Sequence, residues 1–161
     1  MVRHGGTRRR RREDGKGLLD VALVLIPLLA FFLGIIDISF GIFLRNTMQH
    51  AVREGVRYAV TYRTSPGLGH DASIRSIVLQ NSMGFISPAN ASGFIKIRYY
   101  QPDTLAETAA NAPGNIVEVS VEDYTWGWMA PLLRSPEPLR ITARSSDRME
   151  SLPGGTAAPP R

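Results

Sequence analysis

The hydrophobic positions of the sequence form one long run, followed by shorter segments with regular spacing. The run is Val21–Leu44, in which Val, Leu, Ile and Phe predominate and Asp37 is the one charged residue. As a helix rising ~1.5 Å per residue it would extend about 36 Å, more than the ~30 Å hydrocarbon core of a bilayer. Because these apolar side chains outweigh the insertion cost of Asp37, we expect a transmembrane helix over residues 16–44.

Helical spacing continues beyond the membrane run, through residues 46–62. Small and medium apolar residues recur there on one stripe, which consists of Met48, Ala51, Val52, Gly55, Val56 and Ala59. The membrane helix is therefore expected to continue into the next domain and to end before the turn residues Pro66 and Gly67. A second, short helix is expected over Asp71–Met83, with Asp71 as its N-terminal cap.

Three later segments alternate apolar and polar residues as strands do: Phe94–Tyr100, Ile116–Glu122 and Leu139–Ser145. Their polar faces are basic, acidic and basic in turn. Opposite charges on neighbouring strands stabilise a sheet, so we expect an antiparallel sheet of three or four strands with the acidic strand in the centre. Its apolar face would pack on the helix stripe, which gives a small α+β domain over residues 45–150.

The remaining C-terminal segments carry weaker signals. Residues 101–115 are expected to form a loop, and residues 151–161, rich in Pro and Gly, a disordered tail. Large apolar side chains gather before the last predicted strand: Trp126, Trp128, Met129, Leu132 and Leu133. If exposed, they form a candidate partner patch or touch the membrane interface, where tryptophan is enriched; the alternative is that they fold back onto the core.

The charge of the chain is concentrated at its N-terminus. The sequence holds 19 basic and 14 acidic residues, of which seven basic and two acidic lie in the first sixteen, so residues 17–161 are neutral. A nucleic-acid-binding domain would carry its basic patch on the fold, so nucleic acid is not an expected partner. A basic leader over residues 1–15 before an apolar run is instead a topology signal that keeps the N-terminus cytoplasmic.

A cleaved secretory signal is the main alternative to a retained membrane helix. Its apolar region would be shorter, about 7–15 residues, and would end in an A-x-A-like site. The nearest approach is the sequence Ser39-Phe40-Gly41, which matches poorly. We therefore expect the helix to remain in membrane lipid, with everything after Arg45 outside the cytoplasm.

Small and polar residues gather on one side of the predicted membrane helix. At 100° per residue, one arc of about 100° contains Asp20, Pro27, Ala30, Gly34, Asp37 and Gly41, with Ala22 and Ser39 as exceptions. Small residues let helix backbones approach closely in lipid, and intramembrane acids usually face protein. This pattern favours helix–helix packing; the alternative is a lone anchor whose glycines are incidental.

Two stretches resemble a known family. Gly15-Lys16-Gly17-Leu18-Leu19-Asp20, between a basic leader and an apolar helix, resembles a prepilin processing site, with an acid five residues beyond the cut glycine. GLLDVALVLIPLLAFFLGIIDISFG and QHAVREGVRYAV resemble the TadE/TadG-like family of tight-adherence (Flp) pilus assembly proteins, and residues 116–151 do so more loosely. The family more often has glutamate where Asp20 and Asp37 stand, and a small residue where Lys16 stands.

The resemblance implies a bacterial minor pseudopilin in the cytoplasmic membrane, with a pilin-like α+β domain outside. Prepilin peptidase would cut between Gly15 and Lys16, and the other partners would be pilins, pseudopilins and the assembly machinery. In assembled pilins the acid at the position of Asp20 meets the N-terminal amine of a neighbouring subunit. The alternative is that Asp20 sits at the headgroup level beside Lys16 or lipid.

The second resembling stretch has a family-like helix segment: Arg53, Glu54, Gly55, Arg57 and Tyr58. It is interpreted either as a family contact site or, as we favour, as a solvated helix face.

Catalysis, metal and cofactor binding are not expected. The chain has no cysteine, and its three histidines, His4, His50 and His70, lack the spacing of metal ligands. No nucleophile elbow, zinc-protease motif or phosphate-binding loop appears in the sequence. The alternative to a pseudopilin is therefore an uncleaved, membrane-anchored extracytoplasmic binding or scaffold module.

Overall fold

A computed structural model describes residues 7–128, 137–152, 154 and 156–161, with side chains from residue 17 onward. The chain divides into two compact units. One comprises residues 1–40 and 127–137, and the other residues 41–126 and 138–161. The fold is α+β: a long N-terminal helix, followed by a small domain with a four-stranded antiparallel sheet.

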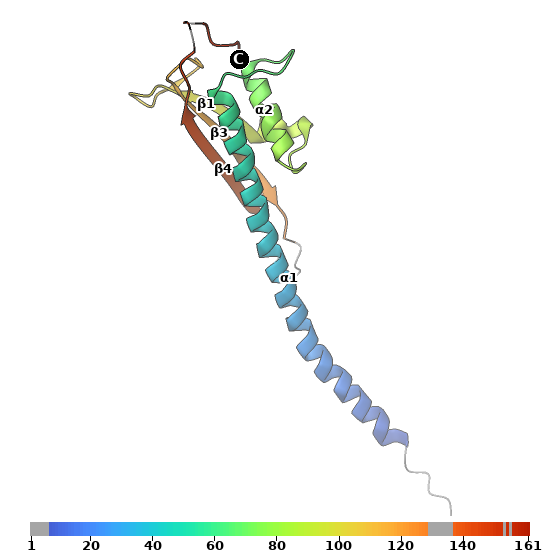
Figure 1. Ribbon diagram of the computed structural model, residues 1–161. Helices are drawn as coiled ribbons and strands as arrows, with labels where there is room; N and C mark the ends of the chain where they lie inside the picture. Colours follow the sequence, from blue (N-terminus) through green and yellow to red (C-terminus); the bar gives the residue numbers. More distant parts are fainter. Residues whose placement is uncertain (1–6, 129–136, 153, 155) are drawn as a thin grey trace, which may run out of the picture. The chain divides into compact units, whose positions relative to one another are not determined.

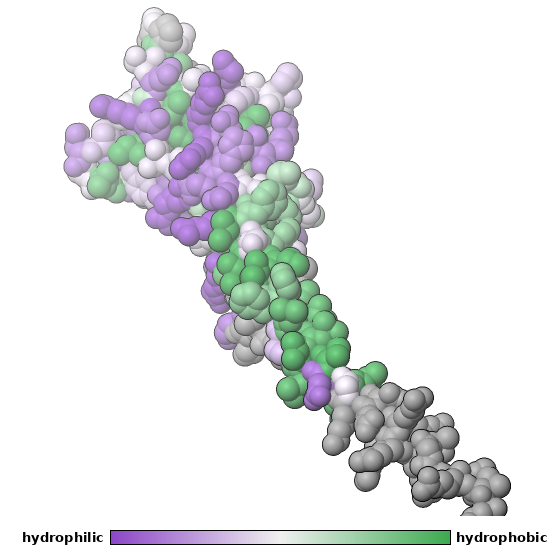
Figure 2. All heavy atoms as spheres, turned by 60° about the horizontal axis from the view of Figure 1, so that its bottom comes forward, coloured by the Kyte–Doolittle hydropathy of each residue, from purple (hydrophilic) through white to green (hydrophobic). Residues whose placement is uncertain are grey.

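Helix α1 (Thr7–Val60) is continuous from the basic leader through the apolar run into the domain. Pro27 lies inside it without ending it. Within the described residues, α1 alone is long and apolar enough to cross a membrane, over Gly17–Val60. Its apolar side chains between Leu18 and Phe43 are exposed, and Figure 2 shows them as a band of hydrophobic surface. This helix fits a single-pass membrane anchor.

The sheet has the strand order β2-β1-β3-β4, with every neighbouring pair antiparallel. The strands are β1 (Ile95–Tyr100), β2 (Glu107–Thr108), β3 (Ile116–Trp126) and β4 (Leu139–Arg148). The acidic strand β3 lies between β1 and β4, which confirms the placement predicted from the charges. The short fourth strand, β2, lies in the segment that was expected to be only a loop.

Strands β3 and β4 extend further than the alternation predicted. Their pairing reaches Trp126 opposite Leu139, and a bulge interrupts the register between Val121 and Tyr124. Asp123 in this bulge has φ +56°, a left-handed conformation that costs energy in a non-glycine residue. The bulge shifts the inside–outside alternation, so the simple period-two pattern ends at Glu122.

The core of the domain forms where α1 meets the sheet and α2 (His70–Asn81) (Figure 1). The stripe predicted on α1 is buried, with Met48, Ala51 and Val52 fully inaccessible to solvent. Gly55 lies at the closest approach, because a Cβ added there would stand 2.6 Å from Val78 Cγ2 of α2 and 3.5 Å from Val119 Cγ1 of β3. The predicted packing of the stripe on the apolar sheet face is thus confirmed.

One local prediction about α2 was wrong. The N-cap of α2 is Gly69, which makes no side-chain cap hydrogen bond, so Asp71 lies inside the helix rather than capping it. The Asp71 carboxylate instead accepts hydrogen bonds from the Tyr99 hydroxyl and the Arg161 guanidinium. Arg161 belongs to residues 151–161, which were expected to form a disordered tail, and it contacts the domain through Asp71. The short helices η1 (Pro88–Asn90) and α3 (Ala91–Phe94) precede β1.

Candidate functional site

The small and polar face predicted on α1 is only partly open to other molecules. Asp20 and Pro27 are exposed and Ala30 is half-buried, whereas Gly34, Asp37 and Gly41 are buried within the chain. We call Asp20, Pro27 and Ala30 the open half of the helix face. It is surrounded by large exposed aliphatic and phenylalanine side chains, so it is the part of the helix where another backbone can approach closely.

The covered half of this face includes a close contact inside the domain. A Cβ added to Gly41 would stand 3.0 Å from Leu139 Cδ2 of β4. Glycine therefore permits a tight approach of α1 to the sheet within one molecule. Asp37 is 2% exposed, so its carboxylate is also enclosed by the chain.

The proposed processing residues, Gly15 and Lys16, lie in the first part of α1. The family-like segment further along α1 is divided between surface and core. Arg53 and Arg57 are exposed and Gly55 is buried, while the Tyr58 hydroxyl lies 3.5 Å from Ser65 Oγ. The arginines thus lie on a solvated face, and the glycine is the contact residue. Gly55 was recognisable in the sequence as a member of the apolar stripe.

Residues 17–57 match a family model described as TadE-like protein. This segment is TadE-like. The match covers the whole open half of the helix face and most of the family-like segment, which confirms the resemblance predicted from these residues. Neither a curated protein nor a solved structure matches the chain. A TadE-like segment indicates a role in assembly of a tight-adherence pilus and interaction with pilus components.

The candidate partner patch, which spans Trp126 to Leu133, lies C-terminal to the TadE-like match. Trp126 and Trp128 are half-buried, and the Trp128 indole N–H donates a hydrogen bond to the Glu137 carbonyl oxygen at 3.3 Å. Met129, Leu132 and Leu133 lie outside the described residues. The partner patch therefore stays a prediction.

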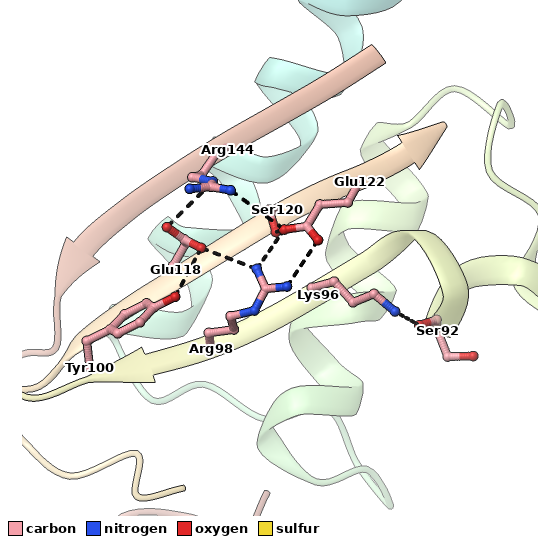
Figure 3. Close-up of polar contacts among 8 residues, drawn as sticks. All are labelled: Ser92, Lys96, Arg98, Tyr100, Glu118, Ser120, Glu122 and Arg144. Atoms are coloured by element: carbon pink, nitrogen blue, oxygen red, sulfur yellow. Dashed lines mark hydrogen bonds and ion pairs between the residues drawn. The ribbon is translucent and has the colours of Figure 1, made fainter. Parts of the chain in front are cut away.

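Beyond the TadE-like segment, the solvent face of the sheet carries a network of alternating charges (Figure 3). Arg98 of β1 donates two hydrogen bonds to the Glu122 carboxylate, at 2.6 and 3.0 Å, and lies 3.5 Å from Glu118. Arg144 of β4 lies 3.6 Å from Glu118 and 3.8 Å from Glu122. Ser120, between the two acids, donates to Glu122 at 2.8 Å. The network links the three main strands.

The Arg98 and Ser120 hydrogen bonds lower the pKa of Glu122 from 4.5 to about 2. A carboxylate with a lowered pKa stabilises the folded state above its unfolded pKa, and that contribution is lost as the pH falls toward the folded value. Between about pH 5 and pH 2 the domain should therefore lose stability through Glu122. The network supports the fold and offers no catalytic arrangement.

We predict that Glu122→Gln lowers the free energy of unfolding by about 1–3 kcal/mol at pH 7, because it removes a charge-assisted hydrogen-bonded pair. The substitution should also flatten the pH dependence of stability between about pH 5 and pH 2. Thermal unfolding of the detergent-solubilised protein at several pH values measures both effects. Asp123→Asn is the control, because that carboxylate is exposed and lies 4.0 Å from Arg140. Equal pH profiles for wild type and Glu122→Gln would contradict the assignment.

The sequence pattern assigned His70 no role beyond that of an isolated histidine. In the structure its side chain is fully buried. Its Nε2 lies 3.2 Å from the Ala59 carbonyl oxygen, and its ring stacks on Tyr62 at a centroid distance of 5.7 Å. Burial lowers its pKa, which favours the neutral ring. No group of three potential metal ligands occurs among the described residues. His70 thus serves the packing of α1 on α2.

Proposed function

We propose that this protein is a minor pseudopilin, a structural component in assembly of a tight-adherence pilus that acts through helix–helix packing. The observation that carries the proposal is the open half of the helix face, in which Asp20, Pro27 and Ala30 lie uncovered on an otherwise bulky apolar helix. In lipid no hydrophobic force draws helices together, so close backbone approach and polar contacts determine where they meet. This half of the face supplies both.

Asp20 is the polar contact in this proposal. A carboxylate in an apolar setting either pairs with a cation or takes up a proton, because the charged form is poorly solvated there. Cleavage after Gly15 would expose the α-amino group of Lys16, about one helical turn from Asp20. In the assembly, the Asp20 carboxylate of one subunit pairs with the Lys16 α-amino group of a neighbouring subunit. This pairing fixes the register between the two helices.

The covered half of the face has a different role. Gly41 approaches Leu139 of the same molecule, so this position holds the domain on its own helix and is closed to a neighbouring one. A neighbouring helix therefore contacts the N-terminal part of α1, near the membrane entry of the chain. The basic leader keeps the N-terminus cytoplasmic, and the α+β domain lies outside.

An uncleaved membrane-anchored module is the second candidate. The observation that favours it is Lys16, a bulky cation at the position that would become the first mature residue. In that case the leader persists, no new α-amine forms, and the domain recruits extracytoplasmic partners.

The mass of the mature chain decides between the two functions. We predict a chain that begins at Lys16 when the protein is expressed with a prepilin peptidase, and an uncleaved chain when the peptidase is omitted. Intact-protein mass spectrometry measures both. Gly15→Leu is the matched control, since it removes the glycine before the cut. Cleavage of a known prepilin in the same cells shows that the peptidase is active. If this chain retains its leader under those conditions, the pseudopilin proposal is overturned.

A further inference from the structure

The last three residues of the sequence contact polar groups near the start of α2, where the C-terminus lies in Figure 1. These groups belong to His70 and Asp71 of α2, Tyr99 of β1, Asn111, and the carbonyl group of Ala109. We call these five residues the tail cradle. It brings together a helix, a strand and a loop that are far apart in the sequence.

Arg161 is the residue most fully engaged by the tail cradle. Its Nε donates to Asp71 Oδ2 at 2.9 Å, and Nη2 lies 2.8 Å from the same oxygen. Nη1 donates to the Ala109 carbonyl at 2.7 Å, and the guanidinium carbon lies 4.8 Å from the centroid of the Tyr99 ring. The planar guanidinium, with donors in fixed directions, suits this combination of carboxylate, carbonyl and aromatic face.

The two prolines are held through their carbonyl groups. The backbone N–H of His70 donates to the Pro160 oxygen at 2.8 Å, and Asn111 Nδ2 donates to the Pro159 oxygen at 2.9 Å. A Cβ added to Gly69 would stand 2.7 Å from the Arg161 backbone, so glycine is needed for the approach. The tail cradle thus contacts main chain and side chain of a Pro-Pro-Arg segment together.

The tail cradle is held in place by contacts that do not involve the tail. His70 Nδ1 lies 3.1 Å from the Tyr99 hydroxyl and 3.4 Å from Asn111 Nδ2. The Tyr99 hydroxyl donates to Asp71 Oδ1 at 2.8 Å, and His70 Nε2 lies 3.2 Å from the Ala59 carbonyl of α1. Because the domain core positions these groups, the site is preformed for its ligand.

The segment that connects β4 to the cradle is short and chemically simple. Residues 151–158 are mainly small residues, proline and glycine, and at ~3.3 Å per residue they reach about 26 Å. Such a linker gives its own tail an effective concentration of about millimolar at the site. When copies are packed side by side in a membrane, the tails of neighbouring chains reach similar concentrations and compete for the same tail cradle. A tail from a neighbour would make the same contacts.

We propose that the tail cradle is a binding site for a Pro-Pro-Arg segment and that a second copy of this chain supplies the segment when copies are packed together. The exchange links extracytoplasmic domains independently of contacts between membrane helices. It requires neither cleavage of the leader nor a pilus, so it is tested apart from the proposed function.

The first experiment measures recognition of the segment by the full-length chain in detergent. The protein is Arg161→Ala, whose own anchor is removed, and the probe is a fluorescent peptide of residues 156–161 with both ends blocked. We expect saturable binding by anisotropy, and about tenfold or more weaker binding of a peptide with alanine in place of arginine. Asp71→Asn in the protein should weaken binding comparably. Equal binding of the two peptides would overturn the site.

The second experiment tests exchange by reversing the ion pair in separate chains. Asp71→Arg and Arg161→Asp each place like charges together in their own cradle and tail, whereas a mixture of the two variants restores opposite charges between molecules. We expect the mixture to form heterodimers by native mass spectrometry, beyond the dimers that either variant forms alone. The double variant, which restores the pair within one chain, is the control for folding. A mixture no more dimeric than its components would overturn exchange between copies.

Discussion

Replacing Asp20 by alanine should leave α1 in the membrane and lower pilus yield about 10- to 100-fold. Insertion is preserved because the substitution removes a charge from an apolar helix. Assembly suffers because a carboxylate paired with an amine between helices is worth about 1.5–3 kcal/mol, which corresponds to this range in an equilibrium constant. Membrane fractionation measures insertion, and sheared-pilus yield measures assembly.

Two matched comparisons separate the role of the acid from a general defect. Asp20→Glu keeps the charge and should retain most of the yield. Ala30→Leu should impair assembly because it fills the open half of the helix face, whereas the same change at Ala22 lies off that face and should be tolerated. A normal pilus yield with Asp20→Ala would contradict the helix-packing mechanism. Equal effects of Ala30→Leu and Ala22→Leu on the yield would also contradict it.

Replacing Gly55 by valine should destabilise the α+β domain by about 2–3 kcal/mol. The first added carbon would already stand 2.6 Å from Val78 Cγ2, and Val78 is a fully buried, β-branched side chain that cannot turn away. The gain in helix propensity over glycine is only about 0.5 kcal/mol and does not compensate. Thermal unfolding in detergent and limited proteolysis of the domain measure the loss.

Gly93→Val is the matched control, because a Cβ at Gly93 of α3 would meet no atom within 4 Å. It should change the midpoint of unfolding far less than Gly55→Val does. If Gly55→Val unfolds at the wild-type temperature, α1 does not pack as closely on α2 and β3 as the structure shows.

The sequence predicts those parts of the fold in which the polarity or charge of a side chain determines which face or strand position it occupies. Val117, Val119 and Val121 alternate with Glu118 and Ser120, and period two permits only one division into inner and outer faces. The charges on these strands then fixed the strand order, because Glu118 needs basic neighbours on both sides. Gly55 fell on the apolar stripe by helical spacing alone.

The remaining features depend on contacts between distant segments, which local patterns do not contain. Asp71 was interpreted as a cap because acids are common there, yet Tyr99 and Arg161 both bind its carboxylate. The composition of the tail predicts disorder, since few of its side chains can be buried. The contacts of Arg161 with Asp71 and Ala109 join residues far apart in the sequence, so composition does not predict them. The bulge at Asp123 likewise depends on pairing with β4.

The position of β4 as an outer strand has a consequence for molecules crowded on one membrane. The outer strand of a sheet is a template on which another copy can add its own outer strand. Arg140, Arg144 and Arg148 recur at every fourth position along β4 and are exposed. In an antiparallel pair of β4 strands centred on Arg144, Arg144 would face its own copy and Arg140 would face Arg148, which is unfavourable. Edge-to-edge pairing in that register is therefore disfavoured, which limits aggregation of a densely packed membrane protein through its strands.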